Sequence, residues 1–136
     1  MPVSTEDYLA VQDHIARYCW AVDDGRGGDW AALFTEDGSF SGFTPEPIVG
    51  RAALKAIPAN AYRDYEGTMC HLASNIVCDY GDTRDTIVAN LYNQVTTWQA
   101  GQGGRNFVMA KSRMTLVRDG GGWLIRSNDV NLMSGA

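Results

Sequence analysis

The sequence predicts an α+β fold in which helices come first and a curved antiparallel sheet follows. Two observations support this class. The first half of the chain places apolar residues at helical spacing, and the second half holds four apolar-rich stretches joined by short turns. Helices that precede such a sheet pack on one of its faces, and the sheet can curl into a cone around a pocket. Residues 1–136 are expected to form one domain.

The first helix is predicted over residues 4–22. Ser4 followed by Asp7 resembles an N-terminal capping box with Asp in place of Glu. Apolar residues then recur every three or four positions and predict one buried stripe: Leu9, Val11, Ile15, Tyr18, Cys19 and Val22. Asp23 borders this stripe, whereas Asp24 falls on the solvated side. Helical phase therefore selects Asp23 as the acidic residue that can face the interior.

Two shorter helices and one strand are predicted before the sheet. A glycine-rich break ends the first helix, and Asp29 is expected to cap a second helix over residues 29–34. A short strand over residues 39–43 comes next. The third helix starts at Gly50 and is expected to end at Pro58, because proline interrupts helical hydrogen bonding.

Four strands are predicted in the second half, over residues 71–80, 86–98, 106–118 and 123–131. Short turns join them, which indicates an antiparallel meander. The strand over residues 86–98 has no cleanly polar or apolar face, as expected if one face partly lines a pocket. Such an open sheet leaves an outer face and edges to cover, which favours a homodimer or homotrimer.

The composition excludes several classes of function. The net charge is -5 and the 11 basic residues are scattered, which argues against nucleic-acid partners and anionic membrane surfaces. No secretory signal or membrane-spanning run is present, so a cytoplasmic location is expected. The three cysteines are widely spaced, which indicates reduced thiols and no zinc site. Cys70 is more typical of a small buried thiol than of a nucleophile.

Asp23 and His71 are the candidate catalytic residues. They are 48 positions apart, so only the fold can bring them together. In a shared pocket they would form a dyad that moves protons near neutral pH. The alternative for His71 is a half-buried strand histidine bonded to a backbone carbonyl. The alternative for Asp23 is a solvated helix end, although an acidic group there opposes the helix dipole. His14 borders the buried stripe and is expected to be structural.

Several runs of the chain resemble SnoaL-like proteins of the nuclear transport factor two (NTF2-like) superfamily. They follow one another in the expected order and span nearly the whole chain: residues 15–23 (IARYCWAVD), 29–40 (DWAALFTEDGSF), 50–54 (GRAAL), 71–75 (HLASN) and 116–125 (LVRDGGGWLI). The resemblance implies the cystatin-like α+β roll, with helices enclosing a pocket. Known members include scytalone dehydratase, a dehydrochlorinase, steroid isomerases, polyketide cyclases, epoxide hydrolases and dioxygenase β subunits.

The resemblance also implies roles for the two candidates. In the dehydratase and the dehydrochlorinase, a His after the third helix acts as the base and an Asp ending the first helix orients it. His71 and Asp23 match these positions. The dehydratase has a second pocket His, and the dehydrochlorinase has a pocket Lys and Arg. Four residues on the later strands are candidates for such additional polar or cationic groups: Asn90, Tyr92, Lys111 and Arg113.

The implied function is a cofactor-independent elimination or double-bond shift on a small cyclic, mostly apolar substrate, with no metal. His71 would remove a proton from carbon while Asp23 holds the other ring nitrogen. The expected lining of the pocket is Tyr18, Trp20, Phe40, Phe43, Tyr92 and Met114. Two alternatives stay open. One is a polyketide cyclase or epoxide hydrolase with Asp23 as the main acid–base group, and the other is a non-catalytic binding module like a dioxygenase β subunit.

Overall fold

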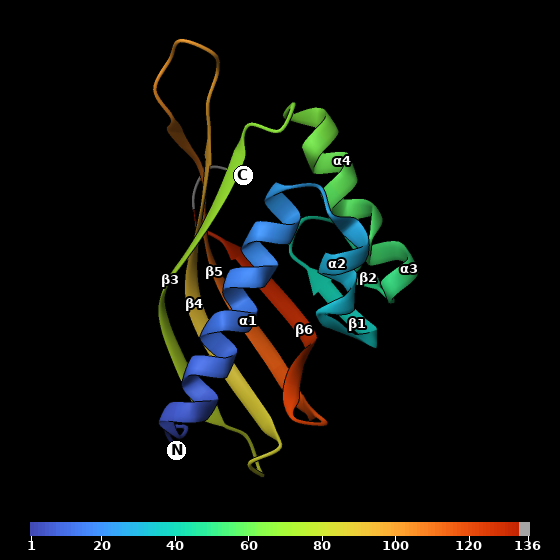
Figure 1. The fold of residues 1–136 in the computed structure, drawn as a ribbon, viewed down its shortest axis with the longest axis vertical. Helices are drawn as coiled ribbons and strands as arrows, with labels where there is room; N and C mark the ends of the chain where they lie inside the picture. The colour runs from blue at the N-terminus through green and yellow to red at the C-terminus, as the bar shows by residue number, and fades with distance from the viewer. Residues whose placement is uncertain (134–136) are drawn as a thin grey trace.

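One curved sheet of six strands is flanked by helices on one side (Figure 1). The computed structural model describes residues 1–133. The helices are α1 (Thr5–Asp23), α2 (Gly27–Ala32), α3 (Arg51–Leu54) and α4 (Ala56–Asp64). The strands are β1 (Phe34–Ser41), β2 (Ile48–Val49), β3 (Met69–Tyr80), β4 (Thr86–Thr97), β5 (Arg105–Asp119) and β6 (Gly122–Leu132). Helix α1 packs mainly against β3, while α2 and α3 pack against β1. The predicted α+β class is confirmed.

The sheet is mixed, with the strand order β2-β1-β6-β5-β4-β3. Strands β3 to β6 form the predicted antiparallel meander, and their bounds lie within two residues of the expected ones. The prediction of a wholly antiparallel sheet is wrong at one pairing. Strand β1 runs parallel to β6, with Phe40 beside Asn128, because the chain returns to β1 only after completing the meander.

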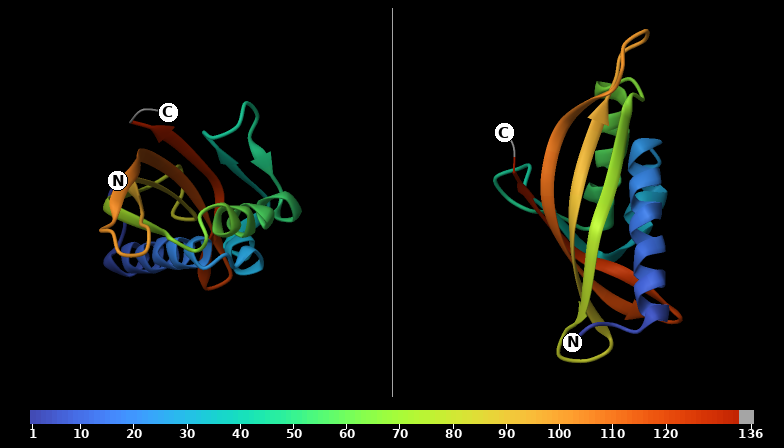
Figure 2. Two further views of the ribbon diagram at one scale, coloured as in Figure 1. Left: turned by 90° about the horizontal axis from the view of Figure 1, so that it is seen from above. Right: turned by 90° about the vertical axis from the view of Figure 1, so that its left-hand side faces the viewer.

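The two faces of the sheet differ in their environment. The inner face, which the helices cover, carries the alternate β4 residues Ile87, Ala89, Leu91, Asn93 and Val95, all of them buried. The register places His71 of β3 beside Val95, and therefore on the inner face. The outer face is open (Figure 2) and exposes Leu72, Val77 and Tyr92. This exposed surface is where the predicted homodimer or homotrimer would form.

Helix α1 begins and ends close to its predicted bounds. Ser4 caps it, because the backbone N–H of Asp7 donates to the Ser4 hydroxyl oxygen at 3.2 Å. Most of the predicted stripe is buried: Val11, Ile15, Tyr18, Cys19 and Val22. The stripe is wrong at Leu9, which is 59% exposed, and the half-buried Tyr8 contacts β3 by donating to the carbonyl of Ile76 at 3.0 Å. Within residues 1–133, no helix combines the length and apolar character needed to cross a membrane.

The short helices differ from the prediction in two places. Helix α2 begins two residues before Asp29, so Asp29 lies in its first turn and binds the Arg26 side chain at 2.9 Å instead of capping the helix. Pro58 does not end the third predicted helix. It is the third residue of α4, where a missing N–H leaves no helical hydrogen bond unmade. The predicted strand over residues 39–43 starts earlier, at Phe34.

Candidate active site

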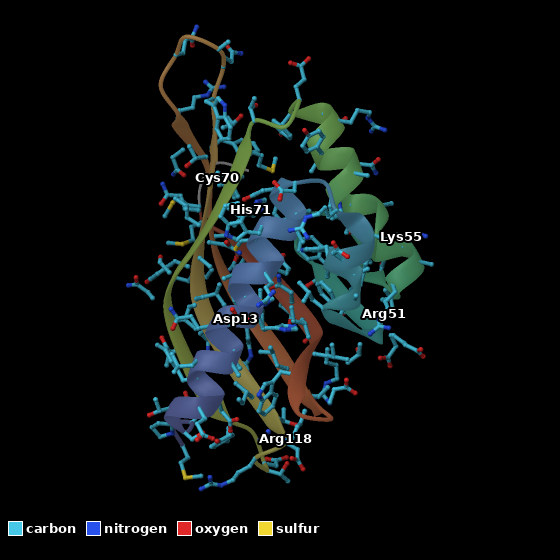
Figure 3. The ribbon with its side chains drawn as sticks, viewed as in Figure 1. Asp13, Arg51, Lys55, Cys70, His71 and Arg118 are labelled. Atoms are coloured by element: carbon cyan, nitrogen blue, oxygen red, sulfur yellow. The ribbon has the colours of Figure 1, made fainter. Side chains whose placement is uncertain are left out.

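The end of α1 meets the start of β3 through a contact between Asp23 and His71. Oδ1 of Asp23 lies 2.7 Å from Nδ1 of His71. The two side chains are 16% and 17% exposed, so the pair is sheltered but reachable from solvent. Figure 3 shows His71 on β3, where this strand passes the last turns of α1. Asp24, the neighbouring carboxylate, is exposed and lies 3.6 Å from the Arg26 guanidinium.

The Asp23 carboxylate also holds the backbone of His71. The N–H of His71 donates to both carboxylate oxygens, at 3.0 and 2.9 Å. Since a carboxylate accepts hydrogen bonds, the ring nitrogen Nδ1 carries the proton that faces Asp23. The other ring nitrogen, Nε2, then has a free lone pair. Within residues 1–133, Nε2 has no hydrogen-bond partner and is not fully enclosed, so it can receive a proton from a bound molecule.

A second polar group on the inner face was missed by sequence reasoning. Asn93 of β4 and Ser112 of β5 are buried, and Nδ2 of Asn93 donates to the Ser112 hydroxyl oxygen at 3.4 Å. Oδ1 of Asn93 is buried without a partner in the described structure. Asn93 is two residues along β4 from Val95, the neighbour of His71, which corresponds to about 7 Å. The pair therefore lies on the same face as the dyad and close to it.

A third polar group lies deeper in the core. Nδ2 of Asn128 on β6 donates to the Tyr18 hydroxyl at 2.9 Å, and burial raises the pKa of Tyr18. The Tyr18 hydroxyl thus keeps its proton. Two further atoms are buried without a partner in residues 1–133, namely Oδ1 of Asn128 and Nε1 of Trp30. The Trp30 ring lies 5.3 Å from the Tyr18 ring, so the unpaired donor and acceptor belong to one cluster.

The unpaired oxygen of Asn93 should lower the stability of the empty protein. Replacing Asn93 by Leu, which is similar in volume and fully apolar, is expected to raise the free energy of unfolding by about 1 kcal/mol, because a buried acceptor without a partner is removed. Urea unfolding of the variant and the natural protein measures the difference. Exposed Asn90→Leu on the outer face serves as the control and should not stabilise. An Asn93→Leu variant that is clearly less stable would show that the Asn93–Ser112 pair is a net structural asset.

Several residues predicted to line the pocket lie elsewhere. Trp20 is 68% exposed on the solvent side of α1. Four residues point to the outer face, because the β4 and β5 positions opposite them in phase are the buried ones: Asn90, Tyr92, Lys111 and Arg113. Their assignment to a pocket with His71 is therefore wrong.

The other predicted lining residues are mostly part of the core. Tyr18, Phe40 and Met114 are buried on the inner side of the sheet. Met114 pairs with Ala89, three inner positions away from Val95 and the dyad. Phe43 is half exposed and stacks on Phe40, with ring centres 5.6 Å apart and planes 2° from parallel. These residues form the floor of the inner face, and their role as substrate contacts stays a prediction.

Two other candidates have structural surroundings. Nε2 of His14 lies 2.9 Å from the carbonyl oxygen of Leu33, and burial lowers the pKa of His14, which keeps the ring neutral. This agrees with the structural role predicted for it. Cys70 is a free thiol, and burial together with nearby Asp23 raises its pKa. A raised pKa disfavours the thiolate and therefore a nucleophilic Cys70.

The family follows from a comparison of the whole sequence. Residues 3–129 match the family model of the SnoaL-like domain. The chain belongs to the SnoaL-like family. Similarity to solved structures supports the same fold, and no curated protein matches the chain.

Three solved structures show how closely the fold of this SnoaL-like domain is shared. Aln2 from a Streptomyces species has a TM-score of 0.88 and is 24% identical, with 97% of this chain and 94% of Aln2 covered. An NTF2-like protein with a cystatin-like fold from Novosphingobium aromaticivorans has a TM-score of 0.85 at 23% identity, with coverages of 96% and 84%. A protein from Catenulispora acidiphila in complex with S-DNPA has a TM-score of 0.80 at 28% identity, with 95% of each chain covered. The predicted NTF2-like fold is confirmed.

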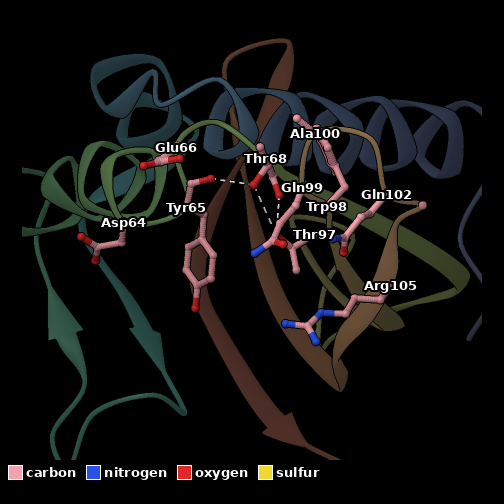
Figure 4. A pocket seen from close by; sticks show the side chains of 11 residues that line it. Asp64, Tyr65, Glu66, Thr68, Thr97, Trp98, Gln99, Ala100, Gln102 and Arg105 are labelled. Atoms are coloured by element: carbon pink, nitrogen blue, oxygen red, sulfur yellow. Dashed lines mark hydrogen bonds between the residues drawn. The ribbon is translucent and has the colours of Figure 1, made fainter.

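Two hollows lie on the surface of the SnoaL-like domain, and neither is lined by the dyad itself. One, of about 690 Å³, opens at the end of the sheet near Thr68 and Thr97 (Figure 4). The other, of about 520 Å³, lies between α1 and α2 and is lined in part by Trp20. Within residues 1–133, no group of three or more His, Cys, Asp or Glu residues is arranged to hold a metal ion.

Proposed function

We propose that the protein is a cofactor-independent lyase or isomerase in which His71 removes a proton from a ring carbon next to a carbonyl group. The 2.7 Å contact between Asp23 and His71 carries this proposal. It gives a base with a free nitrogen, a carboxylate to stabilise the cation that forms, and partial shelter from water. Membership of the SnoaL-like family agrees with such a reaction but does not select it, because one fold hosts many activities.

The proposed reaction begins with proton transfer from carbon to Nε2 of His71. The electrons of the broken C–H bond move toward the carbonyl oxygen and give an enolate, while Asp23 stabilises the imidazolium through Nδ1. In an elimination, the enolate expels a hydroxyl group on the adjacent carbon, and Nε2–H donates the proton that makes it water. In a double-bond shift, Nε2–H returns the proton to a different carbon. Both routes restore neutral His71.

The carbonyl requirement follows from the strength of the base. An imidazole is far too weak to deprotonate a carbon that has no activating group, so the substrate must stabilise the carbanion itself. Oxygen that gains negative charge needs hydrogen-bond donors nearby. The Ser112 hydroxyl accepts from Asn93 and has its own proton free, and it lies on the same face as His71. This pair supports a substrate with oxygen groups on an otherwise apolar ring.

Two alternatives keep support from particular observations. A polyketide cyclase would begin with the same proton abstraction, so the dyad serves that reaction equally well. A non-catalytic binding module is favoured by the two hydrogen bonds from the His71 backbone to Asp23, because they give the carboxylate a structural task. A complex of the similar Catenulispora acidiphila protein with S-DNPA supports a ligand site in either case.

Hydrogen exchange separates catalysis from binding. The probe is 2-tetralone, whose C1 hydrogens lie between a carbonyl and an aromatic ring, and the solvent is D₂O. We expect the protein to accelerate deuterium incorporation at C1 beyond the rate of free imidazole at the same concentration, as followed by proton NMR. Equal exchange with the natural protein and with His71→Gln would contradict the proposal and favour a binding module.

A further inference from the structure

The hollow of about 690 Å³ at the open end of the sheet has a mixed aromatic and charged lining. It lies between the end of α4, the start of β3 and the loop that joins β4 to β5 (Figure 4). Its volume falls within the range of about 300–1,000 Å³ that is usual for small-molecule sites. Nothing in the proton transfer at His71 uses these residues, so the hollow needs a separate explanation.

The hollow is continuous with the inner face that carries the dyad. Thr97, which lines the hollow, pairs with Met69, and the next inner pair along the strands is Val95 with His71. Two residues of a strand span about 7 Å. A molecule whose reacting carbon touches His71 can therefore extend into the hollow if it contains more than one ring.

Aromatic side chains form the walls of the hollow. Tyr65 leans on Phe107 of β5, with ring centres 5.1 Å apart, and this contact links α4 to the far side of the sheet. Tyr65 and Trp98 both keep more than a third of their surface exposed, at 37% and 39%. Large aromatic residues that line a hollow and stay exposed offer flat surfaces against which a ring can stack.

The charges in the hollow lie on separate sides. Within residues 1–133, Arg105 makes no ion pair, and Figure 4 shows its side chain pointing into the hollow. The facing acids are Asp64, which pairs with Arg63 at 3.2 Å, and Glu66. The nearby hydroxyls are already engaged, since the Thr97 hydroxyl donates to the Thr68 carbonyl at 2.7 Å and that of Thr68 donates to the Tyr65 carbonyl at 2.6 Å. Arg105 is thus the one lining cation with free donors in the described structure.

We propose that this hollow binds the end of the substrate distant from His71, and that this end is an aromatic ring bearing a carboxylate held by Arg105. The inference rests on the proposed function for the position of the reacting end. A guanidinium offers paired N–H donors that match a carboxylate, and the aromatic walls match the ring. Asp64 and Glu66 face the other edge of the ring and favour hydroxyl groups there over a second anion.

Two matched dyes test the site without knowledge of the substrate. 8-Anilinonaphthalene-1-sulfonate carries an anionic group on an aromatic skeleton, and N-phenyl-1-naphthylamine has the same skeleton without the anion. We expect Arg105→Gln to weaken binding of the sulfonate about tenfold, because a charge-assisted contact is lost, and to leave binding of the neutral dye unchanged. Fluorescence titration measures both affinities. Arg113→Gln on the exposed outer face is the matched control and should change neither.

The indole N–H signals locate the bound dye. Of the four tryptophans, only Trp98 lines this hollow, so its signal in a ¹H–¹⁵N spectrum should move on titration while the buried Trp30 and Trp123 signals stay in place. Equal sulfonate affinity for the natural protein and Arg105→Gln, or a shift confined to other tryptophans, would overturn the inference. His71→Gln should bind both dyes normally, so loss of hydrogen exchange alone would count against the proposed function and not against this site.

Discussion

Replacing His71 by Ala is expected to lower the protein-catalysed exchange of 2-tetralone hydrogens by roughly 10²–10⁴-fold, the usual contribution of a positioned acid–base group. The reason is that Nε2 of His71 is the proposed proton acceptor, and its neighbours on the inner face offer no second imidazole. The fold should survive, because the side chain is partly exposed and the Asp23 carboxylate still accepts the backbone N–H of residue 71. Proton NMR of the probe gives the rate.

The other histidine supplies a control for this prediction. In His14→Gln, the glutamine amide can still donate to the Leu33 carbonyl, so both the stability and the exchange rate should remain close to those of the natural protein. A loss of exchange in His14→Gln that matches the loss in His71→Ala would show that the effect comes from a disturbed fold. Full exchange activity in His71→Ala would remove the base from the mechanism.

Replacing Asp23 by Ala is expected to lower both stability and exchange. The substitution leaves the backbone N–H and ring Nδ1–H of His71 without their acceptor in a place where both side chains are less than one-fifth exposed. An unsatisfied buried donor costs about 1–3 kcal/mol, so the free energy of unfolding should fall by about that amount. The exchange rate should fall as well, because the imidazole loses its orientation. Urea unfolding and the 2-tetralone assay measure the two effects.

Asp23→Asn separates the two tasks of the carboxylate. The amide oxygen can still accept a hydrogen bond from residue 71, so most of the stability should be kept, whereas the negative charge that stabilises the imidazolium is gone. We therefore expect a large loss of exchange with a small loss of stability. Asp24→Asn, on the exposed neighbour, should change neither. An Asp23→Asn protein with full exchange activity would reduce Asp23 to a structural clamp.

The sequence identifies the dyad because both of its signals are local. Helical phase depends on residues within α1, so the spacing from Cys19 is enough to separate Asp23 from exposed Asp24. The position of His71 at the start of a strand follows from the apolar run after it. Their 2.7 Å contact, in contrast, depends on how α1 lies against β3, and only the resemblance to SnoaL-like proteins indicated it beforehand.

The polar part of the site could not be predicted in the same way. Consecutive strand residues face opposite sides, so an error of one position exchanges the two faces of a strand. The pattern of β4 is ambiguous because polar residues occur in both phases, and Asn90 was chosen where Asn93 is the inner residue. An irregularity in β3 between Ser74 and Val77 shifts its register against β4, and no local signal marks it.

The pairing of β1 with β6 is another feature that local patterns do not reveal. The two strands are separated by the whole meander, and their parallel contact depends on how the sheet curves back toward the helices. The consequence for the site is direct. Phe40 of β1 lies beside Asn128 of β6, which closes the apolar floor around the cluster of Tyr18 and Trp30.

The central claim is that Asp23 holds the His71 ring by Nδ1 and leaves Nε2 free as the base. ¹⁵N NMR of the imidazole nitrogens at neutral pH tests it most directly, because the chemical shifts report which nitrogen carries the proton. The signals can be assigned with His71→Gln, which removes them and leaves those of His14. We predict a protonated Nδ1 and an unprotonated Nε2 in the natural protein. A neutral ring protonated at Nε2 would contradict the account, since no base would then face the inner side of the sheet.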